Sequence, residues 1–239
     1  MKDAGSEAQS LAHSPVIPPR VNGAAPRVSP ALLERFARAY VPDVSDAVGP
    51  LYTLDAALRP LYSPMPRVVG QALTVKLPPG DNLTVHGALR MVQPGDVLVV
   101  DWRGYMGACG TGASSLVVPI QHGLRGVLVD GGWRDVGELR ALNLPICGRG
   151  IAAYSPPKDR IGEINVPVAC GGVVVHPGDI VVGDDEGIVV VPLEAAEVVA
   201  QSLPEHRPRA VMSEYDFDAL ERAAEQRARY FERVLGARS

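Results

Sequence analysis

The segment from Gly126 to Leu139, GVLVDGGWRDVGEL, combines a cation, a carboxylate and flexible backbone at the end of an apolar run. The run is expected to be a buried strand that ends at Asp130, and two glycines separate it from Arg134 and Asp135. Ligand sites in open α/β proteins form just beyond the carboxyl ends of strands. A cation and a carboxylate there could serve an anionic substrate and a metal ion, respectively. The competing interpretation is structural: Asp135, three residues before Glu138, could cap the next helix, and Arg134 could be an ordinary surface residue.

A second candidate is the glycine-rich segment from Gly107 to Leu116, GACGTGASSL. Glycines followed by small hydroxyl residues and an apolar run are typical of a loop that enters a helix. Backbone N–H groups at such an entry are unpaired and bind carboxylates or phosphates. The amides concerned are those of Gly112, Ala113, Ser114 and Ser115. The alternative is that Ser114 only caps the helix. The spacing matches neither a P-loop nor a GxGxxG fingerprint.

Two other groups of polar residues give weaker signals. Asp81, Asn82 and His86 lie close together in GDNLTVH, but a lone histidine is more often a packed or exposed helix residue than a catalyst. The acidic triplet at 184–186 could bind a metal, although such a triplet at a turn is usually only solvated. The sequence contains no GxSxG around its serines and no HExxH, which argues against serine hydrolase and zinc protease chemistry.

The elements that must position these residues alternate between strands and helices. Pro-Gly-Asp precedes two apolar runs, PGDVLVVD and PGDIVVGD, which predicts similar corners in one sheet system. The predicted strands include residues 68–77, 96–101, 126–130 and the β-branched run 168–191. Helices are expected from Ser29 as N-cap with Pro30 at the first position, and at 45–49, 81–91, 114–124, 135–142, 194–203 and 216–235.

Composition restricts the class of protein. The net charge of -4 argues against a nucleic-acid-binding surface, which needs a basic face. Three widely spaced cysteines without a CxxC pair are typical of reduced thiols and give no support for zinc or disulfides. No apolar run is long enough for a membrane span, and the N-terminus lacks the apolar core of a signal peptide. We therefore expect a cytoplasmic protein that binds neither nucleic acid nor membrane.

Taken in order, these segments resemble the RraA-like family. The resemblance rests on PDVSDAVG, GDNLTVHGAL, PGDVLVVD, the glycine loop with Gly112, GVLVDGGWRDVGEL and PGDIVVGDDEGIVVVP, and it covers residues 32–203. The family includes 4-hydroxy-4-methyl-2-oxoglutarate aldolases and oxaloacetate decarboxylases. The resemblance implies an α/β fold, a layered β/β/α swivelling-type domain with a C-terminal helical extension. It also implies a homotrimer or homohexamer with active sites at subunit boundaries.

The domain organisation follows from the same comparison of segments. We expect a flexible, proline-rich N-terminal arm at 1–29, an RraA-like domain at 30–204 and a C-terminal helix within 205–239 at a subunit interface. Family members take an acidic residue from a neighbouring subunit's C-terminal region. Glu214, Glu221 and Glu225 are equivalent candidates for that residue.

For the site, the resemblance implies a class II, divalent-metal lyase acting on a small 2-oxo acid. Asp135 would bind Mg²⁺ or Mn²⁺, Arg134 would hold the oxo group, and the amides of residues 112–115 would hold the carboxylate. Cleavage leaves a pyruvate enolate, whose negative oxygen the cation and the arginine stabilise. Lys76 and Lys158 lack any context for Schiff-base chemistry. One departure is Ala113, because many aldolases of the family have an acidic residue there that orients metal-bound water.

The main alternative belongs to another class, a non-catalytic regulator that acts on a ribonuclease by direct binding, as the family's namesake does. The N-terminal arm, the C-terminal helix and the Arg134–Asp135 pair favour the lyase. A third name found among related sequences, menaquinone methyltransferase, is disfavoured because no glycine-rich nucleotide loop follows an early strand.

Overall fold

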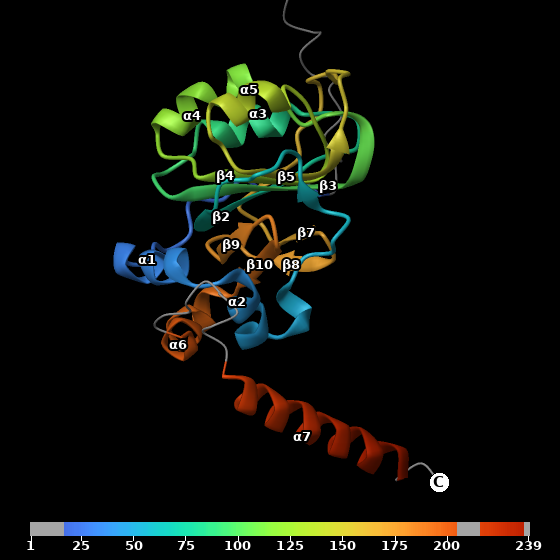
Figure 1. Cartoon of the computed structure of the whole chain (residues 1–239). Coiled ribbons are helices and arrows are strands. Elements are labelled where there is room, and N and C mark those ends of the chain that lie inside the picture. Colours follow the sequence, from blue (N-terminus) through green and yellow to red (C-terminus); the bar gives the residue numbers. More distant parts are fainter. Residues whose placement is uncertain (1–16, 205–215, 237–239) are drawn as a thin grey trace, which may run out of the picture. The chain divides into compact units, whose positions relative to one another are not determined.

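A computed structural model describes residues 17–204 and 216–236 of the chain (Figure 1). The chain divides into two compact units, residues 1–204 and residues 205–239. The first unit contains all the strands of the described residues and every candidate site residue except the C-terminal acids. In the second unit, the described part is the helix α7 (Phe217–Gly236).

The first unit is built on one large mixed sheet with the strand order β1-β5-β4-β3-β2-β9-β10, and β6 pairs with β2. Strands β2, β3, β4 and β5 are parallel to one another, whereas β1, β6, β9 and β10 pair antiparallel with their neighbours. The strand bounds are β1 (Arg59–Pro60), β2 (Val68–Lys76), β3 (Asp96–Cys109), β4 (Gly126–Trp133), β5 (Ile146–Ile151), β6 (Glu163–Ile164), β9 (Ile180–Asp184) and β10 (Gly187–Val191). A separate hairpin joins β7 (Val168–Cys170) to β8 (Val173–Val175).

Helices lie on both outer sides of these strands. The crossover helices α3 (Leu83–Leu89), α4 (Val117–Gln121) and α5 (Val136–Ala141) cover one face of the parallel strands (Figure 1). The helices α1 (Pro30–Arg38), α2 (Val41–Val48) and α6 (Ala196–Ser202) lie on the side of β9 and β10. Short 3₁₀ turns occupy η2 (Pro50–Tyr52), η3 (Ala113–Ser115) and η4 (Leu193–Ala195). The predicted β/β/α layering is confirmed, with a further helical layer outside β9 and β10.

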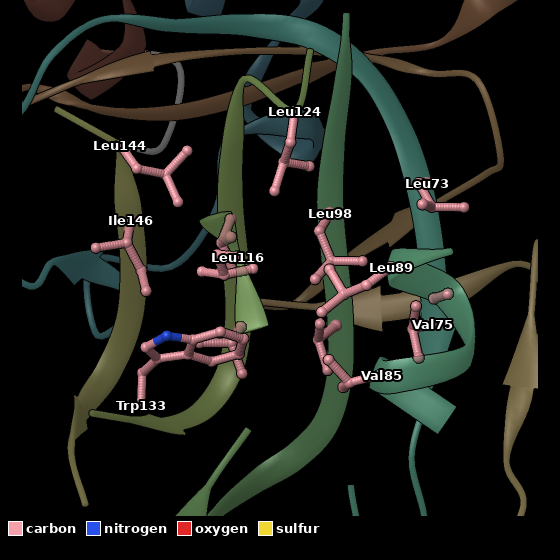
Figure 2. Packing of buried hydrophobic residues seen from close by; sticks show 14 of the residues in the cluster. Leu73, Val75, Val85, Leu89, Leu98, Leu116, Leu124, Trp133, Leu144 and Ile146 are labelled. Carbon is pink, nitrogen blue, oxygen red and sulfur yellow. The ribbon is translucent and has the colours of Figure 1, made fainter. Parts of the chain in front are cut away.

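Burial on both faces explains why the central strands are apolar throughout. One cluster of buried side chains fills the space between the parallel strands and α3 to α5, and Figure 2 shows Trp133 of β4 in it together with Leu116 and Ile146. A second cluster joins the opposite face of the sheet to β7 and β8. A third lies between β9, β10 and the helices α1, α2 and α6. Strands covered on both sides lose the alternation of polar and apolar residues, as predicted for PGDVLVVD.

The two Pro-Gly-Asp corners adopt the same structure. Gly95 and Gly178 have φ of +92° and +88°, and the following aspartates, Asp96 and Asp179, accept hydrogen bonds from the backbone N–H three residues earlier. The corners begin β3 and β9, which flank β2 in the sheet. The prediction of similar corners in one sheet system is confirmed.

Several predicted boundaries are wrong by a few residues. Helix α2 starts at Val41 instead of Ser45, with Pro42 in its first turn. Helix α4 is reduced to residues 117–121 behind the η3 turn. Strand β4 does not end at Asp130 but continues through both glycines to Trp133, because Gly131 and Gly132 pair with β3. A Cβ on either glycine would lie within 2.8 Å of a β3 carbonyl oxygen.

The segment before α1 is described from residue 17 and is bonded to the sheet. Asn22 donates its backbone N–H to the carbonyl of Ile164 at 3.1 Å, and Arg27 forms an ion pair with Asp96. The side chain of Gln71 accepts the N–H of Val28 at 3.0 Å. Residues 1–16 of the expected N-terminal arm lie outside the described residues.

Candidate active site

Gly112 and Asp135 meet where the chain leaves β3 and β4. The backbone N–H of Ala113 donates a hydrogen bond to Oδ2 of Asp135 at 3.0 Å. A Cβ placed on Gly112 would lie 2.2 Å from this oxygen and 3.2 Å from Nε of Arg134. Only glycine therefore allows the carboxylate to approach the loop so closely. The structure brings together the two segments whose residue types indicate a ligand site independently of each other.

Asp135 has an unusual backbone conformation, with φ 58° and ψ 34° in the left-handed region. This conformation costs a non-glycine residue on the order of 1 kcal/mol, although aspartate tolerates it better than most residues. Asp135 is the residue before α5, but its side chain forms no capping bond there. The structural alternative, in which Asp135 caps the helix, is wrong. The carboxylate turns to the Ala113 amide, and the strain belongs to that arrangement.

Arg134 lies beside Asp135, but this ion pair does not occupy the hydrogen-bond donors of its guanidinium. Its Nε is 3.7 Å from Oδ2 of Asp135, and the two side chains are 36% and 34% exposed. An ion pair this long and this exposed contributes little to stability. One guanidinium nitrogen, Nη1, donates to the carbonyl of Ala153 at 3.3 Å, while Nε is buried and has no hydrogen-bond partner among the described residues. The remaining donors of the guanidinium are free to bind a ligand.

The loop amides are partly engaged by the protein itself. The N–H of Ala113 binds Asp135, and the N–H of Ser115 donates to the Gly112 carbonyl at 3.3 Å. The amides of Gly112 and Ser114 have no acceptor within the described part of the chain. No side chain caps η3 or α4, so the alternative role of Ser114 as a helix cap is also wrong. Two free amides beside Arg134 suit an anionic group.

The GDNLTVH segment adds a residue to this site. Asn82 is 1% exposed, and its Nδ2 donates to the carbonyl of Gly110 in the glycine loop at 2.8 Å. Its Oδ1 is buried without a partner among the described residues. Asp81 has a structural role, because its carboxylate accepts three backbone N–H groups. In the sequence this segment gives only a weak signal, because nothing in its local pattern shows the contact with Gly110.

Lys158 is a further charged residue that the sequence pattern does not connect with the site. Burial raises the pKa of the Cys109 thiol, and the charges of Arg134, Asp135 and Lys158 all act on the same thiol. Burial also lowers the pKa of His86, with a smaller effect from Lys158. Lys158 therefore contributes positive charge close to the glycine loop. It stands far from Arg134 in the sequence, in a segment without helix or strand periodicity, so no sequence signal connects the two.

The acidic triplet at 184–186 lies elsewhere and is used in structural contacts. Asp184 forms an ion pair with Arg67 at 3.0 Å, and Asp185 accepts hydrogen bonds from Ser63 and from the backbone of Met65. Of the acidic candidates near the C-terminus, Glu225 pairs with Arg229 at 3.7 Å along α7. Glu221 is exposed on the same helix, and Glu214 lies outside the described residues. The described residues contain no group of three or more metal-binding side chains.

The fold and the site together define an α/β domain with an arginine, a carboxylate and a glycine loop at the ends of parallel strands. Residues 41–190 match the family model RraA-like, Aldolase/RraA, and the chain belongs to this family. A protein of Halalkalibacterium halodurans, provisionally named 4-hydroxy-4-methyl-2-oxoglutarate aldolase, is 39% identical over 75% of this chain and 82% of its own length.

The chain is also similar to solved structures of RraA proteins. Streptomyces coelicolor RraAS2, described as an unusual member of the RNase ES inhibitor RraA protein family, is 30% identical with a TM-score of 0.67, covering 74% of this chain and 92% of that one. The RNA-processing inhibitor RraA from a Thermus species is 27% identical with a TM-score of 0.59, covering 64% and 93%. Among the described helices, none has the length and apolar character needed to cross a membrane.

Proposed function

We propose that this protein is a divalent-metal carbon–carbon lyase that releases pyruvate from a small 2-oxo acid by aldol cleavage, oxaloacetate decarboxylation or both. The observation that carries the proposal is the convergence of Arg134, Asp135 and the free loop amides at Gly112. A regulatory surface does not require a buried glycine pressed against a strained aspartate. The aldolase name of the Halalkalibacterium relative supports the same reaction class.

The residues present fit a divalent cation held mainly through water. Oδ2 of Asp135 is bound to the Ala113 amide, while Oδ1 has no partner within the described residues, and the side chain is one-third exposed. Mg²⁺ commonly binds proteins through one or two carboxylates and keeps several waters. We assign Mg²⁺ or Mn²⁺ to Asp135, where the ion would supply Lewis-acid stabilisation of negative charge.

The chain's own residues account for binding and charge stabilisation. The free amides of Gly112 and Ser114 bind the carboxylate next to the oxo group, and Arg134 donates hydrogen bonds to the oxygen on C2. As the C3–C4 bond breaks, its electron pair forms the C2–C3 double bond of an enolate, and negative charge develops on that oxygen. Donors aimed at developing charge lower the barrier by several kcal/mol, on the order of 3 for one donor.

The two reactions differ only in the fate of C4. In aldol cleavage the C4 hydroxyl loses its proton and becomes the carbonyl of the second product. In decarboxylation the C4 carboxylate leaves as CO₂. In both reactions C3 of the enolate then takes a proton and gives pyruvate. Ala113 offers no carboxylate for either proton transfer, so in this chain the residue after Gly112 acts only through its backbone N–H.

The test is pyruvate release from oxaloacetate and from 4-hydroxy-4-methyl-2-oxoglutarate, with Mg²⁺ and with EDTA. Asp135→Asn keeps an acceptor for the Ala113 amide and tolerates the left-handed backbone, but removes the charge. We expect EDTA and this variant each to reduce turnover at least 100-fold. The matched control is Glu138→Gln, an exposed acid on α5 that should retain activity. Metal-independent turnover, or full activity of Asp135→Asn, would refute the proposal.

A second candidate function is regulation of a ribonuclease by direct binding. The observation that favours it is the similarity to the two RraA inhibitor structures. Absence of turnover on any 2-oxo acid, together with inhibition of a purified RNase E-type enzyme, would select this function. Under either function we propose a cytoplasmic homotrimer or homohexamer with α7 at a subunit interface.

A further inference from the structure

A cavity lies at the opposite end of the parallel strands from the candidate active site. It has a volume of about 1160 Å³ and lies between α1 and the loops that precede β3, β4 and β5. Figure 2 shows two of its lining residues, Leu124 and Leu144, at the far end of these strands from Trp133, the neighbour of Arg134. Pockets for small organic ligands occupy about 300–1,000 Å³. The cavity is therefore large enough for a ligand of that kind, and it is separate from the candidate active site.

Three arginines line this cavity where β2, β3 and β4 begin. The guanidinium of Arg27 forms an ion pair with the carboxylate of Asp96, the first residue of β3. The backbone N–H of Arg125, the residue before β4, donates to the carbonyl of the same aspartate at 2.7 Å. The third, Arg67, precedes β2, which lies beside β3 in the sheet. The pairing of the strands thus brings together three cations that are far apart in the sequence.

Arg125 is the arginine whose guanidinium is available to a ligand. It is exposed, and within the described residues its side chain forms no ion pair or hydrogen bond. Arg67, in contrast, is held by Asp184 at 3.0 Å. Among the described lining residues the one acid is Glu34, which pairs with Arg38 at 3.0 Å. The cavity wall therefore has an excess of positive charge, and guanidinium groups bind carboxylates and phosphates through paired hydrogen bonds.

The rest of the cavity wall is largely apolar. Side chains from α1, β2, α4 and the loops before β4 and β5 contribute to it: Leu33, Val69, Ile120, Leu124, Leu142 and Leu144. A mostly apolar wall with a few convergent polar groups is typical of a site for a small organic molecule. A ligand that matches this wall has an anionic group for the arginines and an apolar body for the remaining surface.

We propose that this cavity is a second ligand site, which binds an amphipathic organic anion with a carboxylate or phosphate group on an apolar body. Arg125 binds the anionic group, and Arg27, which contacts the same aspartate, adds positive charge. The apolar body lies against α1 and the loop before β5. A fatty carboxylate and an organic phosphate share this chemistry. The inference holds whether or not the chain releases pyruvate, because the two sites have no residue in common.

Displacement of the fluorescent probe anilinonaphthalene sulfonate tests the site. The probe combines a sulfonate with an aromatic body and binds apolar protein surfaces. We expect saturable binding to the wild type and displacement by decanoate, by decyl phosphate or by both, and the stronger competitor identifies the preferred anionic group. Decanol lacks the charge and inorganic phosphate lacks the apolar body, so each should compete about tenfold more weakly. No displacement by either charged amphiphile, or equal competition by decanol or phosphate, would overturn the inference.

Variants locate the binding in the cavity. Arg125→Gln should weaken probe binding about tenfold, the effect of one charge-assisted hydrogen bond. The matched control is Arg90→Gln, an exposed arginine after α3 and outside the lining, which should bind the probe as the wild type does. Ala37→Trp fills the cavity from α1 and should abolish saturable binding, whereas Ala31→Trp adds the same side chain at an exposed position of α1 and should not.

Circular dichroism checks the folding of each variant, and the exposed position of Arg125 keeps the test valid if Ala37→Trp unfolds. Arg134→Gln separates the two sites, because it removes the arginine of the candidate active site and should leave probe binding unchanged. Wild-type affinity in Arg125→Gln or in a folded Ala37→Trp, or loss of binding in Arg134→Gln, would place the probe elsewhere and overturn the inference.

Discussion

Gly112 shows how one residue can decide the geometry of the site. The carboxylate of Asp135 occupies the space that any other side chain at this position would need. The bond from the Ala113 amide then holds the carboxylate next to Arg134. The spatial relation of cation, anion and loop therefore depends on the absence of a single Cβ.

Replacing Gly112 with alanine should reduce activity more than stability. The new Cβ would lie 2.2 Å from Oδ2, so the carboxylate must move and release the Ala113 amide. A displacement of about 1 Å in a catalytic group commonly costs about 100-fold in rate. We expect a loss of this size in kcat/KM for pyruvate release, with a nearly unchanged Tm. Gly137→Ala is the control, because no atom lies within 4 Å of a Cβ there, and a comparable loss in both variants would contradict the explanation.

Burial of Cys147 should make the free energy of unfolding decrease as the pH rises in the alkaline range. The side chain is fully buried in β5, and burial raises the pKa of its thiol from 9.0 to about 12. Between these values the unfolded chain loses a proton that the folded chain retains, so the free energy of unfolding falls as pH rises, by up to about 1.4 kcal/mol per pH unit. Urea titrations from pH 8 to 11 should show a steeper decline for the wild type than for Cys147→Ala. Parallel declines would show that other groups dominate.

At the scale of elements, the two Pro-Gly-Asp corners set where strands begin. Each buried aspartate satisfies backbone N–H groups that would otherwise be unpaired at the corner. Asp179 also accepts the N–H of Leu193 at 2.9 Å and so joins the start of β9 to the turn before α6. Burial raises the pKa of this carboxyl, and the two N–H donors oppose that effect. The corner is thus a joint between the sheet and the outer helices.

Removing the hydrogen bonds of Asp179 should destabilise the domain without altering the candidate active site directly. Asp179→Ala removes the acceptor of the partly buried hydrogen bonds from the N–H groups of His176 and Leu193, which costs roughly 1–3 kcal/mol for each group. We expect the free energy of unfolding in urea to fall by about 2–6 kcal/mol. The comparison is Glu186→Ala, an exposed residue of the β9–β10 turn, for which a change under about 0.5 kcal/mol is expected. A loss that small for Asp179→Ala would contradict the structural role of the corner.

At the scale of the whole molecule, the proposed assembly concerns α7. This helix places Leu220, Ala224, Ala228 and Phe231 on one face, and Leu220 and Phe231 are 46% and 63% exposed. A row of exposed apolar side chains on one helix face is typical of a surface that another chain covers. An interface formed by α7 is also what the resemblance to the family implies for the acidic residue expected from a neighbouring subunit.

Phe231→Asp should lower the oligomeric state, because a charge on the apolar face opposes its burial. Light scattering coupled to size exclusion should report a trimer or hexamer for the wild type and smaller species for the variant. Arg222→Asp also introduces an acid in α7 but on the opposite face, and its assembly should match the wild type. A wild-type monomer, or an intact oligomer of Phe231→Asp, would exclude α7 as the interface.

The sequence by itself was sufficient for the family, the α/β class and the two segments that form the site. Glycine, proline and aspartate at fixed spacings restrict the backbone locally, and apolar runs identify buried strands, so these features are visible without coordinates. The alternatives that stayed open were those that depend on distant partners. Whether Asp135 caps a helix or faces a ligand depends on Gly112 and Ala113, which approach it only after β3 and β4 pair.

Only the tertiary structure showed the contributions of Asn82 and Lys158. Their segments are far apart in the sequence and have no periodicity that relates them. In the folded chain, Asn82 donates a hydrogen bond to Gly110, and Tyr154, four residues before Lys158, accepts one from Cys109. From the sequence, Gly131 and Gly132 predict the end of the strand, because glycine usually permits turns. In the folded chain they continue β4, since the absence of a Cβ allows β3 to pack against them. Local chemistry fixes which conformations are possible, and long-range packing selects among them.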